Sequence, residues 1–519
     1  MPLSFDRRQF VKAFSAAVSM AGLRAAGQSA PQTTEDTAPH TMAHAAWVGG
    51  HPTKIRPDLV AIQTKPFCWN DEGVENVLDD LQKKGAVNTV YSYTYDTDPN
   101  RIHQGGHLPG HGKYGPPGLR TGGGYFDYDP KFFLNTNIRE FRSFDDGKFN
   151  VITDVAPQMK ARGIDYFALD FNNPFPVMMK TIPGYTEVAE VDIDGMRTTT
   201  PCYNHPSYRA FLQGKIEVYL KQYAEHVDGI LWSAENMGPF DNLIGGDWAM
   251  IGVSCFCHYC TRKGKDRGIS AERAKEGYRK LQYLFRPGPK MGQRPPDGYF
   301  ATFWRTLLEF PEILSWQKLW MDSYTELRAE LYGEAKSIAP EKPFGFHIQQ
   351  NVTFSPFYSA TEDFARLAKI SDFLKVATYN NAGGPRMGRL VERLADTVFR
   401  DTDSAKLLPV YYDMMGYREA TVPEITLNGL TSEYVVSATK RIMADVGDKT
   451  KIYPGIDIGV PTGATGEKKT HADDVRKAVA AAWGTGVPGI VLSRDYSEME
   501  LDSLEAAGDA TRAFFNKPA

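Results

Sequence analysis

Nine short apolar runs recur along the chain between residues 59 and 496, each rich in β-branched and aromatic residues. Gly, Pro, Asn or Asp bounds each run, and several runs are apolar almost throughout, as in strands with two buried faces. The runs cover residues 59–67, 86–95, 163–171, 227–235, 343–351, 372–380, 407–413, 451–459 and 488–496. Amphipathic helical patterns separate them. This alternation predicts an α/β fold in which a parallel sheet closes into a (β/α)8 barrel, the TIM barrel.

Such a barrel has eight strands, so one of the nine runs is surplus. We expect residues 407–413, LLPVYYD, to lie at the rim or to belong to an insertion. Two of the helices are well marked. One starts at Pro206 and Ser207 and keeps apolar residues at helical spacing, and the other runs from about Thr470 to Gly484.

Two segments are long insertions, residues 97 to about 146 and residues 240–340. Both follow the ends of predicted strands, where a barrel builds its site. We therefore expect both to wall a pocket on the C-terminal face. The first insertion carries His103, His107 and His111 among glycines. We interpret these histidines as part of a solvated loop rather than as a metal site.

The composition excludes several classes of function. The chain has 519 residues, with 59 Lys and Arg against 63 Asp and Glu, for a formal net charge of −4. Without basic blocks it lacks the electrostatic footprint of a nucleic-acid-binding protein. No apolar run reaches the roughly 18 to 20 residues that a membrane span needs. We expect neither a nucleic-acid partner nor a membrane span.

The first thirty residues look like a targeting segment. Arg7 and Arg8 precede a weakly apolar stretch from Ala13 to Leu23, and small residues follow up to Ala30. This pattern resembles a twin-arginine export signal, which implies export of the folded protein to the periplasm or out of the cell. The expected organisation is a signal peptide at residues 1–30, a flexible linker at 31–50 and a catalytic barrel at 51–519.

Carboxylates end or follow several predicted strands. They are Asp170, Glu235, Asp413, Asp457 and Asp495. Because barrel chemistry takes place at the C-terminal ends of the strands, these side chains are candidates for catalysis. Cleavage of a glycosidic bond needs one carboxylic acid to protonate the leaving oxygen and a second carboxylate to attack or to activate water. Any single Asp could equally cap a helix or pair with a cation, whereas the long insertion after Glu235 favours a desolvated acid there.

Polar and aromatic residues also lie near the predicted strand ends, among them His347, Gln349, Tyr379, Asn380 and Tyr411. Amides and hydroxyls bind sugar hydroxyls, and aromatic rings stack on sugars, although a core role is as ordinary for Tyr and His. The residues that we expect to bind substrate are Asp170, Asn236, His347, Tyr379, Asp413 and Asp495.

Three of the five cysteines, Cys255, Cys257 and Cys260, fall within six residues. They are too close together for comfortable disulfides but well placed as ligands of a tetrahedral zinc ion, which needs a fourth. The candidates for the fourth ligand are Cys202, Cys68 and His258. A set of buried thiols, or one disulfide with a spare thiol, is the alternative. We expect a structural zinc ion and no organic cofactor.

The order of these motifs resembles a known family. Glu235 ends the fourth predicted strand, the CxCxxC cluster follows about twenty residues later, and an aromatic helix over residues 299–304 leads to Phe310-Pro311-Glu312. Residues 227–312 thus resemble the catalytic barrel of the glycoside hydrolase family 42 β-galactosidases of clan A, and of uncharacterised hydrolase-like families near them.

The resemblance implies that Glu235 is the general acid/base of a retaining mechanism and that Cys202 is the fourth zinc ligand. Two departures affect the catalytic residues. The family has Asn directly before its acid/base Glu, where this chain has Ala234, with Asn236 after the Glu. The family's nucleophile is a Glu at the end of the seventh strand, where this chain offers Asp457.

Three functions follow as hypotheses. The first is an exported glycoside hydrolase with Glu235 and Asp457 as catalytic residues and a carbohydrate substrate, with a homo-oligomer possible. The second is a metal-dependent sugar isomerase or lyase that holds a divalent cation with Asp170, His347, Asp413 and Asp457. The third is a carbohydrate-binding barrel without catalysis.

Overall fold

The computed structural model describes residues 57–97, 111, 121–145, 147–172, 176–245, 252–286, 294–460 and 468–516. All of them belong to one compact unit, His44–Ala519. The signal peptide and linker expected at residues 1–50, together with His103 and His107, lie outside the described residues. The expectations for these segments stay predictions.

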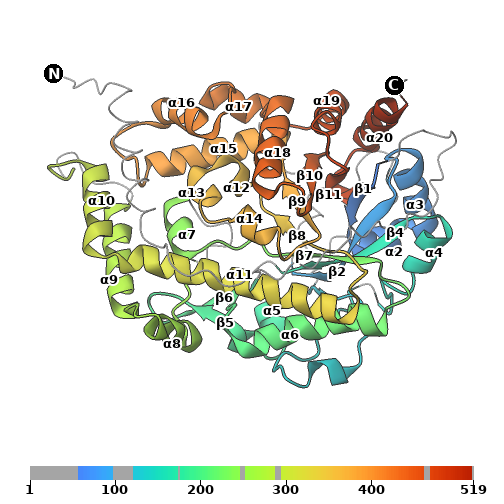
Figure 1. Ribbon diagram of the computed structural model, residues 1–519, viewed down its shortest axis with the longest axis horizontal. Coiled ribbons are helices and arrows are strands. Elements are labelled where there is room, and N and C mark those ends of the chain that lie inside the picture. The colour runs from blue at the N-terminus through green and yellow to red at the C-terminus, as the bar shows by residue number, and fades with distance from the viewer. Residues whose placement is uncertain are drawn as a thin grey trace. The chain divides into compact units, whose positions relative to one another are not determined.

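Eight parallel strands form a closed barrel (Figure 1). Around the ring they are β1 (Leu59–Thr64), β2 (Thr89–Asp96), β4 (Asp165–Phe171), β7 (Gly229–Ser233), β8 (Phe344–Ile348), β9 (Phe373–Ala377), β10 (Lys451–Asp457) and β11 (Gly489–Asp495). The first and last strands pair in parallel, beginning with Leu59 opposite Gly489, and this pairing closes the sheet. Each strand falls on one of the predicted runs, with β2 extending one residue past its run to Asp96, and the order around the ring is the order along the chain. The predicted (β/α)8 barrel is confirmed.

The ninth predicted run, residues 407–413, is helical. It lies in α16 (Ser404–Met415), where buried residues recur every three or four positions, at Leu407, Leu408, Tyr411, Tyr412 and Met415. The side chain of Asp403 starts this helix by accepting a hydrogen bond from the backbone N–H of Lys406. A short apolar run fits either a strand or a buried helix, so the sequence pattern was ambiguous here. Asp413, expected at a strand end, is exposed on α16.

Helices surround the barrel and occupy the connections between its strands (Figure 1). Besides α16 they are α2 (Pro66–Glu72), α3 (Val74–Lys83), α4 (Ala156–Ala161), α5 (Pro176–Thr181), α6 (Pro206–Glu217), α7 (Pro239–Gly245), α8 (His258–Asp266), α9 (Ala271–Leu284), α10 (Tyr299–Glu309), α11 (Glu312–Ile338), α12 (Asn351–Phe354), α13 (Pro356–Ser359), α14 (Phe364–Leu367), α15 (Asn380–Ala395), α17 (Val422–Asn428), α18 (Ser432–Val446), α19 (Ala472–Trp483) and α20 (Leu501–Phe515). The two well-marked helices of the sequence are α6 and α19. Within the described residues, none of the helices is both long and apolar enough to cross a bilayer.

The insertions hold further elements. The one between β7 and β8 contains α7 to α11, and a two-residue strand, β3 (Gly123–Gly124), pairs antiparallel with β2. A hairpin of β5 (Ala189–Val191) and β6 (Arg197–Pro201) precedes α6. His111, expected in a solvated loop, instead has a buried side chain. Its Nδ1 lies 3.0 Å from Glu72 Oε1, which corrects that expectation.

Aromatic rings fill the middle of the barrel. The ring centroid of Tyr91 lies 5.5 Å from that of Phe167 and 6.2 Å from that of Phe373, which in turn lies 5.5 Å from Tyr453. Gly345 makes room for them, because a Cβ atom at this position would lie 2.4 Å from the Phe373 ring. A barrel packed in this way offers its chemistry at the carboxyl ends of the strands.

A buried ion pair joins the barrel to its helical layer. Leu169 and Phe171 belong to the barrel core, so Asp170 between them points outward to α6. There Lys215 Nζ lies 2.7 Å from Asp170 Oδ1 and 2.9 Å from Asn172 Oδ1. Both side chains of the ion pair are fully buried. The expectation that Asp170 lines the substrate site is wrong, because alternation along β4 turns it away from the barrel interior.

Replacing Lys215 by Met leaves the carboxylate of Asp170 buried without its cation. We expect the free energy of unfolding to fall by about 3–5 kcal/mol, measured by urea denaturation. The matched control is Lys221→Met, which removes a surface ion pair between Lys221 and Glu217, four residues earlier in the chain. We expect this change to lower the free energy of unfolding by less than about 0.5 kcal/mol. Equal losses in the two variants would contradict this account of the ion pair.

Candidate active site

Glu235 lies two residues beyond the end of β7, at the carboxyl end of the barrel. Its side chain is 31% exposed, and its Oε1 atom lies 2.8 Å from Nε2 of His347 on the neighbouring strand β8. Burial, together with the positive charge of Lys375, lowers the pKa of His347 to about 4. The imidazole is therefore neutral at pH 7, and in the tautomer with its proton on Nε2 it donates a hydrogen bond to the carboxyl group of Glu235.

The backbone around Glu235 is held from α11. Tyr324 donates a hydrogen bond from its hydroxyl to the carbonyl of Ala234, at 2.9 Å. Trp232, fully buried at the end of β7, contacts the rings of Tyr324 and Phe346. The insertion after β7 thus returns through α11 to fix the segment that carries the glutamate.

Of the residues expected to bind substrate, His347 and Tyr379 lie near the carboxyl group of Glu235, whereas the side chain of Asn236 is directed at Tyr203. His347 contacts Glu235 directly, and the charge of Glu235 acts on the pKa of Tyr379. Asn236 is buried and donates a hydrogen bond from Nδ2 to the hydroxyl of Tyr203, at 2.5 Å. Its amide therefore supports the segment between β6 and α6, which carries Tyr203.

Lys375 is a neighbour of Glu235, His347 and Tyr379 that the sequence analysis did not single out. It lies on β9, in register with His347 on β8, and is 1% exposed. Its Nζ donates a hydrogen bond to the hydroxyl of Tyr379, at 2.5 Å. Burial lowers the pKa of Lys375 to about 7, against an opposing effect of Glu235. A lysine inside the apolar strand FLKVA was the signal that could have revealed it.

Two arginines complete the group, and the search for acids at strand ends missed both. Arg494, on β11, donates from Nε to Glu498 Oε2, at 2.7 Å, and also pairs with Glu498 through Nη2. Arg386, on α15, donates from Nη1 to Gln350 Oε1, at 2.8 Å. Both are close enough to Lys375 to lower its pKa.

Asp457 is at the end of β10, as predicted, but its carboxylate is fully engaged. Its Oδ1 accepts hydrogen bonds from the backbone N–H groups of Gly459 and Val460 and from the Thr470 hydroxyl, at 2.9 to 3.2 Å. Its Oδ2 accepts from the backbone N–H of Ala382 in the first turn of α15, at 2.8 Å. The side chain is 0% exposed. This geometry is that of a structural cap and not of a nucleophile.

Asp495, at the end of β11, is in a different state. Its Oδ1 accepts hydrogen bonds from the N–H and hydroxyl groups of Ser497, whereas its Oδ2 is buried and has no hydrogen-bond partner among the described residues. Burial, and next the charge of Glu498, raises the pKa of Asp495 to about 7. Around the ring, β11 lies opposite the β7 strand of Glu235.

The cation site expected for a metal-dependent isomerase or lyase does not form. Asp170 faces α6, Asp413 is exposed on α16, and Asp457 caps α15, so the four expected ligands do not converge. Among the described residues, three or more metal-ligating side chains bring their ligand atoms together at the cysteine cluster.

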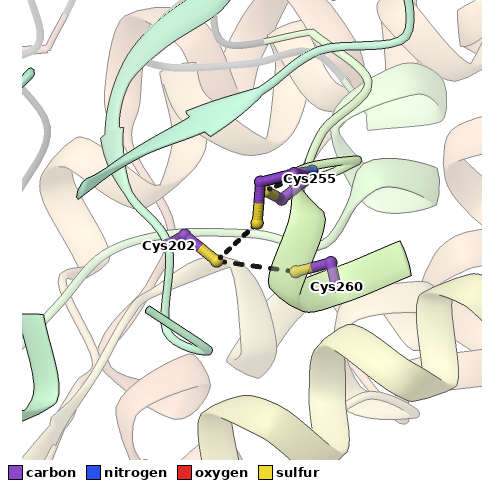
Figure 2. Close-up of side chains that lie close together, drawn as sticks. Cys202, Cys255 and Cys260 are labelled. Atoms are coloured by element: carbon purple, nitrogen blue, oxygen red, sulfur yellow. Dashed lines mark hydrogen bonds between the residues drawn. The ribbon is translucent and has the colours of Figure 1, made fainter. Parts of the chain in front are cut away.

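The cysteine cluster brings together the four thiols expected from the sequence (Figure 2). Cys202 follows β6, Cys255 and Cys257 precede α8, and Cys260 lies in its first turn. All four sulfur atoms lie within 4.8 Å of one another, with Cys202 Sγ at 3.4 Å from Cys257 Sγ and 3.5 Å from Cys260 Sγ. His258 is exposed. Of the three candidates for the fourth position, Cys202 is the one beside the cluster.

The cluster fits a tetrahedral metal. Zn–S bonds of about 2.3 Å place the sulfur atoms of a tetrahedral site about 3.8 Å apart, and the observed separations bracket that value. Backbone N–H groups of Val191 and Asn204 point at Cys255 Sγ and Cys202 Sγ, each at 3.4 Å. Such donors stabilise thiolates.

No protein-family model matches the chain, and no curated protein matches it. Among solved structures it is similar to a β-galactosidase from Marinomonas ef1, with 8% identity and a TM-score of 0.49 over 88% of this chain and 59% of that chain. It is similar to a β-galactosidase from Halorubrum lacusprofundi, with 12% identity and a TM-score of 0.49 over 89% and 58%. It is also similar to the PgaB glycoside hydrolase domain from Bordetella bronchiseptica, with 11% identity and a TM-score of 0.44 over 88% and 98%.

The chain spans less than two thirds of the length of the two β-galactosidases. Likeness at these identities and TM-scores says nothing about substrate or mechanism. The function therefore has to be inferred from the residues of this chain.

Asp457→Asn keeps the size of the side chain but weakens its acceptance of four hydrogen bonds. We expect the variant to melt several degrees lower, because buried hydrogen bonds to a charged group each contribute about 1.5–3 kcal/mol. Calorimetry measures the shift. Asp473→Asn, at an 80% exposed position, is the control and should melt with the parent. A variant of Asp457 with unchanged melting and no turnover would restore the nucleophile assignment.

Proposed function

We propose that the chain is a glycoside hydrolase in which Glu235 is the general acid and base. The observation that supports this proposal is the pair of Glu235 and neutral His347 at the carboxyl end of the barrel, with the glutamate still partly exposed. A proton-transferring carboxyl group has to be reachable by the leaving oxygen and held in one orientation. This pair meets both conditions.

The hydrogen bond from His347 also decides which oxygen of Glu235 carries the proton. Because Nε2–H donates to Oε1, the protonated form of the acid holds its proton on Oε2. Transfer of that proton to a glycosidic oxygen leaves the negative charge beside an imidazole donor and near Lys375. Both stabilise the carboxylate that remains.

For the second carboxyl group we propose Asp495 in place of the predicted Asp457. Its Oδ2 is buried without a partner among the described residues, and a pKa of about 7 lets it give or accept a proton near neutral pH. Its strand lies across the ring from β7, so a sugar bound at the barrel mouth could lie between the two acids. Their separation would set retention or inversion, and NMR of the first-formed anomer reads it out.

A bound structural zinc ion is a further part of the proposal. Cys202, Cys255, Cys257 and Cys260 would hold it, and it would tie the end of β6 to the start of α8. Export through the twin-arginine route, with the metal already in place, remains our proposal for the location of the protein. It rests on the sequence of residues 1–30, where Arg7 and Arg8 precede a weakly apolar stretch and small residues up to Ala30.

Glu235→Gln removes the acid while keeping the hydrogen bond to His347. On aryl glycosides with poor leaving groups, we expect turnover to fall by about 10²–10⁴-fold, with unchanged melting. Dinitrophenyl glycosides, whose leaving group needs little protonation, should lose much less. Glu272→Gln, at an 81% exposed position, is the control and should keep full activity. Equal loss on both classes of substrate would remove Glu235 from the acid role.

Cys202→Ser should lose the metal, whereas Cys68→Ser should keep it. Both cysteines are buried and free, but Cys68 lies outside the cluster, so the pair separates metal ligation from loss of a buried thiol. We expect about one zinc ion per chain in the parent and in Cys68→Ser, measured by plasma mass spectrometry. A full complement of zinc in Cys202→Ser would contradict the site.

A further inference from the structure

Three cationic side chains, Lys375, Arg386 and Arg494, lie near the acid of the proposed catalytic site. Glu235 affects the pKa values of His347, Lys375 and Tyr379, and of two arginines, and none of these groups is a carboxylic acid. A site for a neutral sugar has no need of several cations. The composition of the site therefore carries information about the charge of the substrate.

Lys375 is the central cation. Its side chain is buried, and no carboxylate among the described residues forms an ion pair with it, so its one hydrogen bond goes to the neutral hydroxyl of Tyr379. The end of the side chain points into the site. A Cβ atom at Gly455 would lie 2.9 Å from Lys375 Cε, 3.0 Å from Ser493 Oγ and 3.2 Å from the Tyr379 ring. The absence of a side chain at Gly455 lets these three groups pack close together there.

Arg494, on β11, is close enough for its positive charge to lower the pKa of Lys375. It binds Glu498 through Nε and Nη2, and its Nη1 makes no hydrogen bond with the described residues. Its side chain is 15% exposed. Arg386 adds a third cation, with its guanidinium carbon 5.8 Å from the centre of the Tyr379 ring. The three cations come from β9, β11 and α15, so each is placed by a different element.

Such a group of charges is unfavourable by itself. A buried ammonium group without a counter-ion loses hydration, and two neighbouring guanidinium groups repel it. The lowered pKa values of Lys375, to about 7, and of Arg386, to about 10, have these causes. An anionic ligand would relieve the effect on Lys375, because it supplies a counter-charge to the ammonium group in a site from which water is largely excluded.

We propose that the substrate carries an anionic group, a carboxylate as in a uronic acid or a sulfate ester, on the sugar next to the bond that Glu235 protonates, and that Lys375 and Arg494 bind this group. The inference rests on the proposed glycoside hydrolase activity and names its substrate class. Lys375 would contribute a point charge, and Arg494 an N–H donor from the opposite side.

The test uses matched pairs of substrates that differ in charge. These are 4-nitrophenyl β-D-glucuronide against the β-D-glucoside, 4-nitrophenyl galacturonide against the galactoside, and the 6-sulfates of the two neutral glycosides. We expect the parent to favour at least one anionic member of a pair by about tenfold or more in kcat/KM. Uronides and sulfates form separate arms, so the result also identifies the anion.

Lys375→Met keeps the length of the side chain and removes its charge. We expect kcat/KM on the preferred anionic substrate to fall by about 30-fold or more. On neutral substrates it should fall by a clearly smaller factor, because there the variant loses only the stabilisation of the Glu235 carboxylate. The control is Lys451→Met at the opposite end of the neighbouring strand β10, where the side chain pairs with Asp58. Lys375→Gln is a second variant in case the first is poorly folded.

Calorimetry with the free sugars, D-glucuronate and D-galacturonate against D-glucose and D-galactose, measures binding without turnover. Lys375 is faced by His347, Glu235, Tyr379, Arg386 and Arg494. Because the protonated lysine binds the anion, affinity should fall as the pH rises from 6 to 8 in the parent. In Lys375→Met the fall should be much smaller, because only the ionisation of Asp495 then opposes the anion in this range.

The outcomes separate the two proposals. Cleavage of neutral glycosides with no preference for their anionic partners overturns the inference and leaves the hydrolase intact. Binding of an anionic sugar that depends on Lys375, without cleavage of any glycoside, supports the inference and removes the hydrolase. No binding and no cleavage of any anionic sugar overturns the inference.

Discussion

Parallel pairing of β1 with β11 closes the sheet, and the rest of the site depends on this closure. It places Glu235, His347, Lys375 and Asp495, which are spread over 261 positions of the chain, at the carboxyl ends of strands in one ring. The aromatic side chains in the middle of the barrel fill its interior and so hold the strands apart. Local sequence then needs only to decide which side chain stands at each strand end.

Desolvation explains the unusual protonation states at this end of the barrel. The pKa values of His347 and Lys375 are lowered and that of Asp495 is raised, so that each shift favours the neutral form of the side chain. Burial is the largest cause of all three shifts. Neutral imidazole can donate to Glu235 without competing for its proton. A lysine and a carboxylic acid that both titrate near pH 7 make the charge of the site sensitive to the ligand.

The sequence predicted the barrel because apolar strands between turn residues leave few other folds. It failed at residues 407–413, where a buried helix face and a buried strand look alike over seven residues. For Asp170, the prediction of a strand was right, but the prediction that its side chain faces the substrate site was wrong. Successive side chains along a strand point to opposite faces of the sheet. The cysteine cluster was predicted from spacing and a resemblance. Lys375 and the arginines were missed because the search at the strand ends covered acids, amides, histidines and aromatic residues but not cations.

At each of the two positions where the sequence departs from the resembled family, the structure shows a specific contact. Without an Asn before the acid, His347 supplies the hydrogen bond that orients Glu235. Asp457, at the place of the nucleophile, instead accepts from the N–H of Ala382 in the first turn of α15, where a negative charge is favoured by the helix dipole. That contact fixes the helix that carries Arg386 and the tyrosine before it. In this chain Asp457 therefore supports the start of α15 and, through it, the position of Arg386.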